Sequence, residues 1–546
     1  MKRRLHDALR LAAELHPNKN GALMRERKMT YAEWDAASGR VATALRDAGC
    51  RRGDRVGLLL PKSLEALIGM FGVLKADCIY VPLDPASPPA RLARILESAD
   101  CRLVLAAGSA SGLLNAVIRG NGMGTTAIGW MDDGAGLEGS TPVRFSGQDL
   151  QSLPAAPADS SEAREEDVAH ILFTSGTTGV PKGVMITHFN VTQFVDWGIK
   201  QFGMNSEDRI SGHPPLHFDL STFDIHGSVA AGAELHLVPP ELNLLPCRLA
   251  DFIRNARLTQ WFSVPSILTH MAKSDAIQSG DFPSLRRLLW CGERFPTPSL
   301  IHWMRRLPHV SFFNLYGPTE TTIASSCCRI DECPVEETAE IPIGQPCEGE
   351  NLLVLDEKLQ PTPVGETGDL YISGVGLSPG YWRDSARTEA AFQPNPFEPG
   401  TRIYKTGDLA RRGDDSRIYL SGRSDSQIKS RGYRIELGEI EAALHAQPEV
   451  QDAAVVAIES GGFEGMAICC AWVPAAGCET TPVRLKGRLT QLLPAYMVPA
   501  HWMVVDRMPL NGNGKTDRPC LKMHFRKIVE EPARSIAQFA HEAVAS

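Results

Sequence analysis

The N-terminal part of the chain alternates between two patterns of apolar positions. Trp34, Val41, Ala44 and Leu45 keep the spacing of one helix face, whereas short continuous apolar runs are typical of buried strands. The pattern predicts a helix, a turn with a strand, a second helix and a second strand over residues 29–48, 53–60, 64–74 and 78–83. Helices and strands that alternate at this pitch favour a mostly parallel α/β sheet.

The pattern changes twice further along the chain. Residues 106–165 are rich in Gly, Ala, Ser and Pro, and we expect a surface excursion there with a weak strand or two. Glycine-punctuated runs at 365–374 and 380–382 predict a β-rich part with tight turns. Residues 439–444 begin an amphipathic helix.

Composition places the chain among ordinary globular proteins. Its 546 residues exceed the usual size of one domain, and it is 43% hydrophobic and 22% charged. The net charge of −8 argues against general nucleic-acid binding. The longest apolar region, residues 56–83, is interrupted by Lys62, Glu65, Lys75 and Asp77, so no membrane-spanning segment is supported.

The cysteines indicate a reducing compartment. The 13 cysteines form no CxxC pair and no metal-like Cys/His spacing. The neighbouring pairs Cys327–Cys328 and Cys469–Cys470 are poorly placed to bridge each other, and the odd total speaks against a disulfide framework. The basic N-terminus lacks a following apolar core and is typical of an amphipathic helix, not of a signal peptide. We therefore expect a cytoplasmic protein without a membrane partner.

The most informative stretch follows the apolar run 171–173, which predicts a buried strand. Glycines let the backbone approach a ligand, consecutive amides form a concave anion site, and hydroxyls and a lysine add donors suited to phosphate. The stretch lacks the Gly-Lys-Ser/Thr of a Walker A loop, and an isolated loop of this kind is most often an ordinary turn. The candidate phosphate-binding residues are Thr174, Ser175, Gly176, Thr177, Thr178, Gly179 and Lys182.

The string Thr174–Gly183 resembles the phosphate loop of the adenylate-forming (ANL) enzymes. That superfamily includes acyl-CoA synthetases, luciferases and the adenylation domains of nonribosomal peptide synthesis. Other stretches resemble the family's further motifs in the same order, at residues 217–225, 314–322, 404–409, 421–441, 493–499 and 509–518. The resemblance covers about residues 25–520.

The resemblance implies a fold of two domains. We expect a large α/β N-terminal domain, with parallel sheets, helices and a β-rich subdomain, over residues 1–424. A small α+β lid domain follows at 425–520, with Asp425 as the hinge between the two. Residues 521–546 form a tail without an assigned function, in which 535–544 fit a short helix.

The resemblance also implies a site for ATP and Mg²⁺. Glu320 corresponds to the family's Mg²⁺ ligand, and Thr319 to its partner on the α-phosphate. Lys515 corresponds to the lysine that bridges the substrate carboxylate and that phosphate. Taken alone, residues 314–322 would indicate only a strand-terminating turn, and Lys515 a surface lysine. The remaining nucleotide-binding candidates are Asn314, Tyr316 near the adenine, Asp408 at the ribose, and Arg423 at the ribose or phosphate.

A further set of positions concerns the substrate. Taken alone, Asp219 is more typical of a helix N-cap. In amino-acid-activating relatives an aspartate at this position pairs with the substrate α-ammonium, and an acid without the amine would leave a desolvated carboxylate unpaired. The family's pocket positions correspond to Asp219, Leu220, Phe223, Ser263, Leu289, Cys291, Leu315, Ile323 and Ala324.

These pocket residues favour a small neutral amino acid. Most of them are bulky and apolar and leave little room, and an ionised substrate side chain would find no second charge. Alanine is the first choice, with proline, serine, cysteine and glycine behind it. Cys291, in the string Trp290–Glu293, resembles a cysteine of the D-alanine–carrier-protein ligases, which hints at alanine without fixing its handedness.

The implied enzyme is an AMP-forming ligase with two half-reactions. A carboxylate attacks the α-phosphate of ATP, and a thiol then attacks the acyl adenylate. We find no carrier-protein, condensation or thioesterase motif, and we expect a stand-alone ligase that loads the phosphopantetheine thiol of a separate carrier protein. One alternative is an acid–CoA ligase, which Asp219 disfavours; another, of a different class, is a non-catalytic nucleotide-binding partner protein.

A basic cluster is a candidate contact for an acidic carrier. Arg484, Lys486 and Arg488 precede the stretch 493–499. The alternative is an ordinary solvated face, which is the more common role of such a cluster.

Overall fold

The computed structural model describes residues 4–120, 122–124, 126–134, 136–137, 141–155, 161–176, 181–460, 465–478, 480–512 and 515–530. Internal contacts divide the chain into two compact units. The first contains residues 1–85, 95–173 and 182–425, and the second contains residues 86–94, 174–181 and 426–546. The functional division into a core at 1–424 and a lid at 425–520 stays a prediction.

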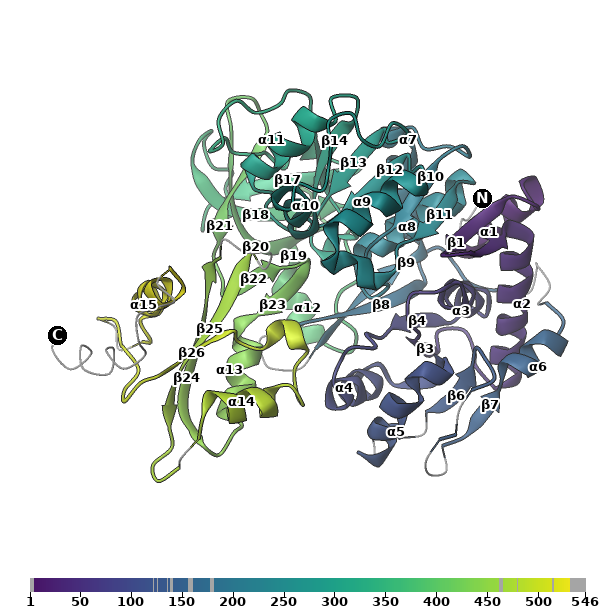
Figure 1. Cartoon of the computed structure of the whole chain (residues 1–546), viewed down its shortest axis with the longest axis horizontal. Coiled ribbons are helices and arrows are strands. Elements are labelled where there is room, and N and C mark those ends of the chain that lie inside the picture. Colours follow the sequence, from purple (N-terminus) through teal and green to yellow (C-terminus); the bar gives the residue numbers. More distant parts are fainter. Residues whose placement is uncertain are drawn as a thin grey trace. The chain divides into compact units, whose positions relative to one another are not determined.

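A seven-stranded sheet in the first unit has the alternating architecture predicted near the N-terminus (Figure 1). The strand order is β7-β6-β5-β3-β4-β8-β9, and every pair from β7 to β8 is parallel. The two predicted helices are α2 (Tyr31–Asp47) and α3 (Leu64–Lys75). The strands are β3 (Arg55–Leu59), β4 (Ile79–Pro82), β5 (Cys101–Ala106), β6 (Ala127–Trp130), β7 (Val143–Phe145), β8 (Val168–Thr174) and β9 (Lys182–Thr187).

Of the expected surface excursion with a weak strand or two at 106–165, the strands are present as β6 and β7, but the surface location is wrong for β6. All four residues of β6 are buried, and the strand extends the sheet between β5 and β7. Gly129 has a packing role there, because a Cβ atom at this position would lie 2.3 Å from the Phe145 ring. Small residues in this segment therefore permit close packing instead of marking a loop. Two helices also lie in the segment, α5 (Ser111–Arg119) and α6 (Gly147–Ser152).

A nine-stranded sheet forms the second layer of the first unit, in the order β16-β15-β14-β13-β12-β10-β11-β1-β2. Its inner pairs, from β1 to β14, are parallel, and its outer pairs are antiparallel. The strands are β1 (Asn20–Met24), β2 (Arg27–Thr30), β10 (Arg209–Gly212), β11 (Glu234–Leu237), β12 (Gln260–Ser263), β13 (Arg287–Trp290), β14 (Ser311–Tyr316), β15 (Ser326–Ile330) and β16 (Gln345–Pro346). The helices near them in sequence are α1 (Leu5–Leu15), α7 (His188–Phe202), α8 (Asp219–Ala231), α9 (Pro246–Asn255), α10 (Pro265–Lys273) and α11 (Thr297–Arg306).

An antiparallel sheet of five strands completes the first unit and agrees with the predicted β-rich part. Its order is β17-β18-β20-β19, and β21 pairs with β20. The strands are β17 (Glu350–Leu355), β18 (Thr367–Gly374), β19 (Phe392–Pro394), β20 (Arg402–Arg412) and β21 (Ile418–Arg423), and α12 (Ser385–Ala391) precedes β19.

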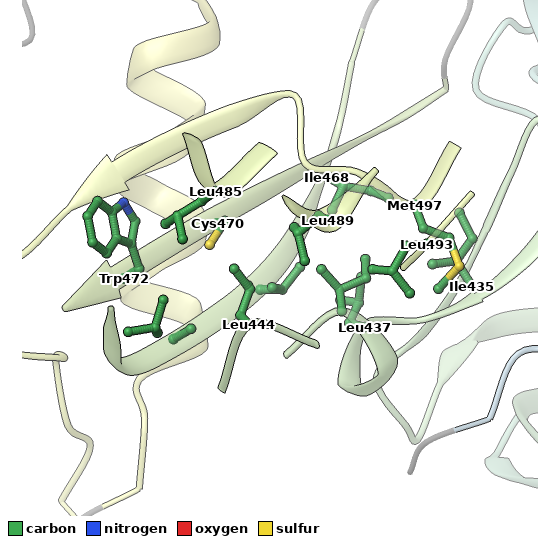
Figure 2. Packing of buried hydrophobic residues seen from close by; sticks show 14 of the residues in the cluster. Ile435, Leu437, Leu444, Ile468, Cys470, Trp472, Leu485, Leu489, Leu493 and Met497 are labelled. Carbon is green, nitrogen blue, oxygen red and sulfur yellow. The ribbon is translucent and has the colours of Figure 1, made fainter. Parts of the chain in front are cut away.

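The second unit is a small α+β body, as predicted. A buried row of apolar side chains from strands and helices forms its core, with Trp472 at one end and Ile435 and Met497 at the other (Figure 2). The predicted amphipathic helix at 439–444 is α13 (Leu437–His445), and Leu437 and Leu444 face this core. The other elements are β22 (Gln427–Ser430), β23 (Tyr433–Glu436), β24 (Val450–Glu459), β25 (Met466–Pro474), α14 (Pro482–Leu489), β26 (His501–Val504), α15 (Arg518–Glu530) and part of α4 (Pro89–Ala99).

Two expectations from composition can be compared with these elements. Within the described residues, no helix combines the length and the apolar character that crossing a bilayer requires. All 13 cysteines are described, and each is a free thiol. The predicted tail helix at 535–544 lies outside the described residues.

Candidate functional site

The carboxyl ends of β12, β13 and β14 carry Ser263, Leu289 and Leu315 of the predicted amino-acid pocket. Parallel register aligns Leu289 with Phe313, so Leu289 and Leu315 share one face of the sheet. Ser263 aligns with Trp290 and therefore lies on the opposite face. Because ligands of open α/β sheets bind at this edge, the position fits a substrate site. Except for Asp219, every predicted pocket residue is buried: Leu220, Phe223, Ser263, Leu289, Cys291, Leu315, Ile323 and Ala324.

Phe223 is fixed by aromatic packing. Its ring lies 5.2 Å from that of Phe194 and 6.1 Å from that of Phe262, centroid to centroid. A Cβ atom at Gly198 would come within 2.5 Å of the Phe223 ring, so the glycine is what lets α7 approach. Such a packed ring is poorly placed to move aside, and the pocket wall at Phe223 is therefore rigid.

Asp219 begins helix α8 and contacts Thr319. The N-cap residue is Phe218, so the simple N-cap interpretation of Asp219 is wrong. At the first helical position its negative charge lies at the positive end of the helix dipole. The Thr319 hydroxyl donates a hydrogen bond of 2.7 Å to Asp219 Oδ2. The structure therefore joins the candidate ammonium ligand to the candidate α-phosphate residue.

The loop before Asp219 is anchored by a lysine that the sequence showed only as a break in an apolar run. Lys62 is 9% exposed, and its ammonium donates to the carbonyl oxygens of Gly212, at 2.9 Å, and of His213. Burial lowers the pKa of Lys62 to about 7. Burial also raises the pKa of Asp224, which lies in α8 five residues beyond Asp219. Lys62 is thus a structural anchor of the segment that leads to Asp219.

Glu320 is completely buried in a network of polar side chains. Its Oε1 accepts a hydrogen bond of 3.1 Å from Lys182 Nζ and one of 2.8 Å from the Tyr381 hydroxyl. The Lys182 ammonium also lies 4.9 Å from the centre of the Tyr381 ring. A carboxylate removed from water needs such compensation. Tyr381 was missed in the sequence, where residues 380–382 indicated only a turn.

These residues fit a Mg²⁺ ion that is shared with a nucleotide. Protein sites for Mg²⁺ often use one or two carboxylates and leave the other positions to water and phosphate oxygens. Glu320 supplies one such carboxylate. Within the described part of the chain, no group of three or more His, Cys, Asp or Glu side chains is arranged to hold a metal. A single carboxylate of this kind suits a metal that also takes phosphate and water oxygens as ligands.

Asp408 is held from two sides at the predicted ribose site. Its Oδ2 accepts a hydrogen bond of 2.6 Å from the Tyr316 hydroxyl, and its Oδ1 lies 2.6 Å from Arg423 Nη1. Burial, followed by the Asp408 charge, raises the pKa of Tyr316 well above its usual value. The structure gives Tyr316 a role in orienting Asp408, and its contact with adenine stays a prediction. Asn314 donates to the Pro342 carbonyl oxygen at 2.8 Å.

The predicted hinge residue Asp425 lies where the first unit ends along the chain. Arg423 makes two hydrogen bonds to its carboxylate, of 2.7 and 2.8 Å. Gly407 has a φ of 76°, and a Cβ atom there would lie 2.5 Å from Asp425 Oδ2. The carboxylate of Asp425 is therefore fastened to the first unit by Arg423, and rotation at this residue stays a prediction.

The remaining phosphate-loop candidates belong to the second unit. Thr174 ends β8, the Ser175 hydroxyl donates to the Arg434 carbonyl oxygen at 2.6 Å, and the Gly176 amide donates to Glu439 at 3.2 Å. Three further candidates, Thr177, Thr178 and Gly179, lie outside the described residues.

Lys515 lies in the second unit and is hydrogen-bonded through its backbone to Asn511. The Asn511 amide donates to the Lys515 carbonyl oxygen at 2.7 Å, and the Lys515 amide donates to Asn511 Oδ1 at 3.1 Å. Its side chain is exposed, which suits a lysine that must reach a ligand.

The predicted basic cluster does not form a single surface. All three residues lie on α14, where a spacing of two places Lys486 away from the face shared by Arg484 and Arg488. Arg488 is also paired with Glu449 at 2.5 Å. The hypothesis of a three-residue patch is therefore wrong in its geometry.

Two family models match the chain. One, described as AMP-binding enzyme, covers residues 9–382, and the other, described as AMP-binding enzyme C-terminal domain, covers residues 439–515. The chain belongs to the AMP-binding enzyme family. The predicted superfamily and the class of AMP-forming ligase are therefore confirmed.

Curated relatives of this AMP-binding enzyme are long synthetases. It is 34% identical to tyrocidine synthase 3 of Brevibacillus parabrevis, with 92% of this chain and 7% of the relative covered. It is 35% identical to surfactin synthase subunit 2 of Bacillus subtilis, with 94% and 14% covered. The chain spans less than a fifth of the length of these two relatives.

Solved structures confirm the fold class. The Vibrio cholerae adenylation domain AlmE, solved in complex with glycyl-adenosine-5'-phosphate, superposes with a TM-score of 0.82 at 23% identity, covering 96% of this chain and 98% of AlmE. Holo-PA1221, an NRPS protein with adenylation and PCP domains, gives a TM-score of 0.75 at 26% identity, covering 95% and 84%.

The network around Glu320 predicts a measurable loss of stability. Tyr381→Phe removes a hydrogen-bond donor to the buried carboxylate of Glu320 and should lower the free energy of unfolding by about 1–3 kcal/mol. The matched control is Tyr419→Phe, which removes a 2.9 Å hydrogen bond to the exposed Asp415. This control should change the free energy of unfolding by less than about 0.5 kcal/mol. Urea unfolding measures both. Equal, small effects of the two substitutions would contradict the network.

Proposed function

We propose that this enzyme activates a small neutral α-amino acid, with alanine favoured, and transfers it to the phosphopantetheine thiol of a carrier protein. The observation that carries the proposal is the hydrogen bond between Thr319 and Asp219. It links a carboxylate suited to an α-ammonium with a hydroxyl suited to the α-phosphate. An amino acid bound at Asp219 would thus have its carboxylate close to the phosphate that it must attack.

The chemistry of the first half-reaction is mainly electrostatic. The amino-acid carboxylate attacks the α-phosphorus of ATP, the bond to pyrophosphate breaks, and the aminoacyl adenylate remains. Mg²⁺, when bound at Glu320, would offset charge on the phosphate oxygens. The cationic side chains of Lys182 and Lys515 suit the same anionic oxygens, and the Thr319 hydroxyl supplies a further donor. Asp408 is suited to accept hydrogen bonds from the ribose hydroxyls.

The pocket supports a small substrate. The eight buried pocket residues contribute no charge, so an ionised substrate side chain would stay unpaired among them. One methylene more or less changes selectivity by only about 1–3 kcal/mol, and weak activity with glycine or serine is therefore expected. Proline and cysteine remain candidates, and handedness is open.

The carrier partner is supported by the relatives. Two curated relatives are named tyrocidine synthase 3 and surfactin synthase subunit 2, and holo-PA1221 is described as an NRPS protein that contains adenylation and PCP domains. We extend that partnership to this chain. A carrier on a separate polypeptide stays a prediction from the sequence.

Loading of a carrier tests the proposal directly. The protein is incubated with Mg·ATP, alanine and a phosphopantetheinylated carrier protein, and intact mass spectrometry follows the carrier. A mass increase of one alanine residue that requires ATP is expected. Formation of an acyl-CoA in preference to the carrier thioester, or no AMP release with any amino acid, would overturn the proposal.

Lys515 should serve adenylation and not thiol transfer. Its exposed loop position in the second unit fits a group that approaches the reacting atoms only in one step. Lys515→Ala should lower alanine-dependent pyrophosphate exchange by about 10²-fold or more, with unfolding unchanged. The nearby Lys522→Ala is the control. Thioester formation from pre-made alanyl-AMP should survive, and its equal collapse would contradict this division of roles.

Asp425 should act as a hinge. Asp425→Pro fixes φ at this residue, whereas Asp425→Ala removes only the carboxylate held by Arg423. The proline variant should impair one half-reaction more than the other, measured by pyrophosphate exchange and by thioester formation from alanyl-AMP. If the proline and alanine variants behave alike in both assays, no rotation at this residue is needed.

A further inference from the structure

The turn at residues 319–324 is strained. Thr322 and Ile323 have φ angles of 62° and 73°, in the left-handed region that β-branched residues rarely adopt. Thr319 and Glu320 precede these two residues, and Ala324 follows them. Because such a conformation persists only where its surroundings hold it, the contacts behind the turn decide the shape of the pocket.

A loop at residues 374–378 lies directly behind this turn and is tied to it. The Thr322 hydroxyl donates to the Gly376 carbonyl oxygen at 2.7 Å, and the Ser378 amide donates to the Glu320 carbonyl oxygen at 2.9 Å. On its other side, Asn190 of α7 donates to the Val375 carbonyl oxygen at 2.9 Å. The loop is therefore a brace between α7 and the strained turn.

Glu350, the first residue of β17, fastens the centre of the brace. It is 8% exposed, and its Oε1 accepts a hydrogen bond of 2.6 Å from the Gly376 amide. A Cβ atom at Gly376 would lie 2.4 Å from Glu350 Oε1 and 2.6 Å from the Thr321 carbonyl oxygen, so only glycine fits between them. Among the described residues, the second carboxyl oxygen, Oε2, has no hydrogen-bond partner.

A small cavity is lined by Glu350 and by the predicted pocket residue Ala324. It has a volume of about 10 Å³, enough for about one water molecule, and Thr322, Ala324 and Cys347 line it together with Glu350. Ala324 is one of the predicted pocket positions. Glu350 thus stands one layer behind the amino-acid pocket.

The surroundings of Glu350 favour its uncharged form. Burial raises the pKa of Glu350 to about 8. Cys347, whose carbonyl oxygen accepts a hydrogen bond from the Glu350 amide, is also buried, and burial raises the pKa of its thiol. At the edge of the cavity, Glu348 is paired with Lys200 of α7 at 2.9 Å. The other α7 residues at the cavity are uncharged: Asn190, Gln193, Phe194 and Trp197.

We propose that Glu350 is a positioning residue for the amino-acid pocket, which it shapes by holding Gly376 and, through Gly376 and Thr322, the pocket wall at Ile323 and Ala324. This inference rests on the proposed function, because the pocket is assigned by that function. Glu350 contacts neither substrate nor nucleotide in this account. Its effect should fall on amino-acid binding more than on ATP binding.

Three substitutions test the role of Glu350 by pyrophosphate exchange. Glu350→Ala leaves the Gly376 amide without its acceptor and should raise the KM for alanine about ten-fold, with the KM for ATP changed less than about two-fold. Glu350→Gln keeps an acceptor for Gly376 and should behave like the wild type at pH 7. The matched control Glu348→Gln removes a neighbouring exposed carboxylate and should change neither KM.

The pH dependence separates positioning from a general structural role. Ionisation would place a charge on a buried carboxyl whose Oε2 has no hydrogen-bond partner among the described residues, so the contacts behind the pocket wall should rearrange. In the wild type, the KM for alanine should therefore rise above about pH 8, and Glu350→Gln should lack this rise. A wild-type rise that persists in Glu350→Gln would overturn the proposal. Equal changes in both KM values for Glu350→Ala, or no change in either, would also overturn it.

Unfolding keeps the inference testable if no amino acid is activated. Between the ordinary pKa of 4.5 and about 8, folded Glu350 holds a proton that the unfolded chain has released. The free energy of unfolding of the wild type, compared with that of Glu350→Gln, should therefore decrease as the pH rises from about 4.5 to about 8. A difference that is flat with pH would contradict the buried, uncharged carboxyl, whereas the absence of exchange with every amino acid would contradict only the proposed function.

Discussion

The buried carboxylate of Glu320 imposes the constraint on which the rest of the site depends. A carboxylate without solvent needs donors, and removing one partner of a buried pair typically costs about 3–5 kcal/mol. Lys182 at the start of β9 and Tyr381 beyond β18 supply them. The need to satisfy one side chain therefore joins segments from three parts of the first unit and fixes the turn that carries Thr319.

The turn at residues 319–324 also carries residues of both predicted sites, the one for the nucleotide and the one for the amino acid. Thr319 and Glu320 face the predicted phosphate site, and Ile323 and Ala324 border the predicted pocket. Asp219 approaches from helix α8 and accepts a hydrogen bond from Thr319. A small displacement of this turn would therefore affect both substrates, which explains why it is held from behind by hydrogen bonds to residues 375–378.

The sequence predicted what depends on local pattern or on a contiguous motif. Helices α2 and α3 follow from periodicity, and Asp219, Glu320 and Asp408 follow from their motifs. Tyr381 and Lys62 could not be found in this way, because they act through partners 61 and about 150 residues away. A strand was expected near β6, but its burial was not, because its glycine permits close packing although a glycine-rich composition usually indicates a loop. Lys515 and Ser175 belong to the second unit, and the hinge at Asp425 stays a prediction.

The central claim is that the Asp219 carboxylate selects amino acids by their α-ammonium group. The most direct measurement is pyrophosphate exchange with alanine and with propionate, which differ only in that group, for the wild type and for Asp219→Asn. The account predicts a strong preference of the wild type for alanine and a loss of most of that preference in the variant, with the KM for ATP nearly unchanged. Equal activity of the wild type on both acids, or an undiminished preference for alanine in Asp219→Asn, would contradict it.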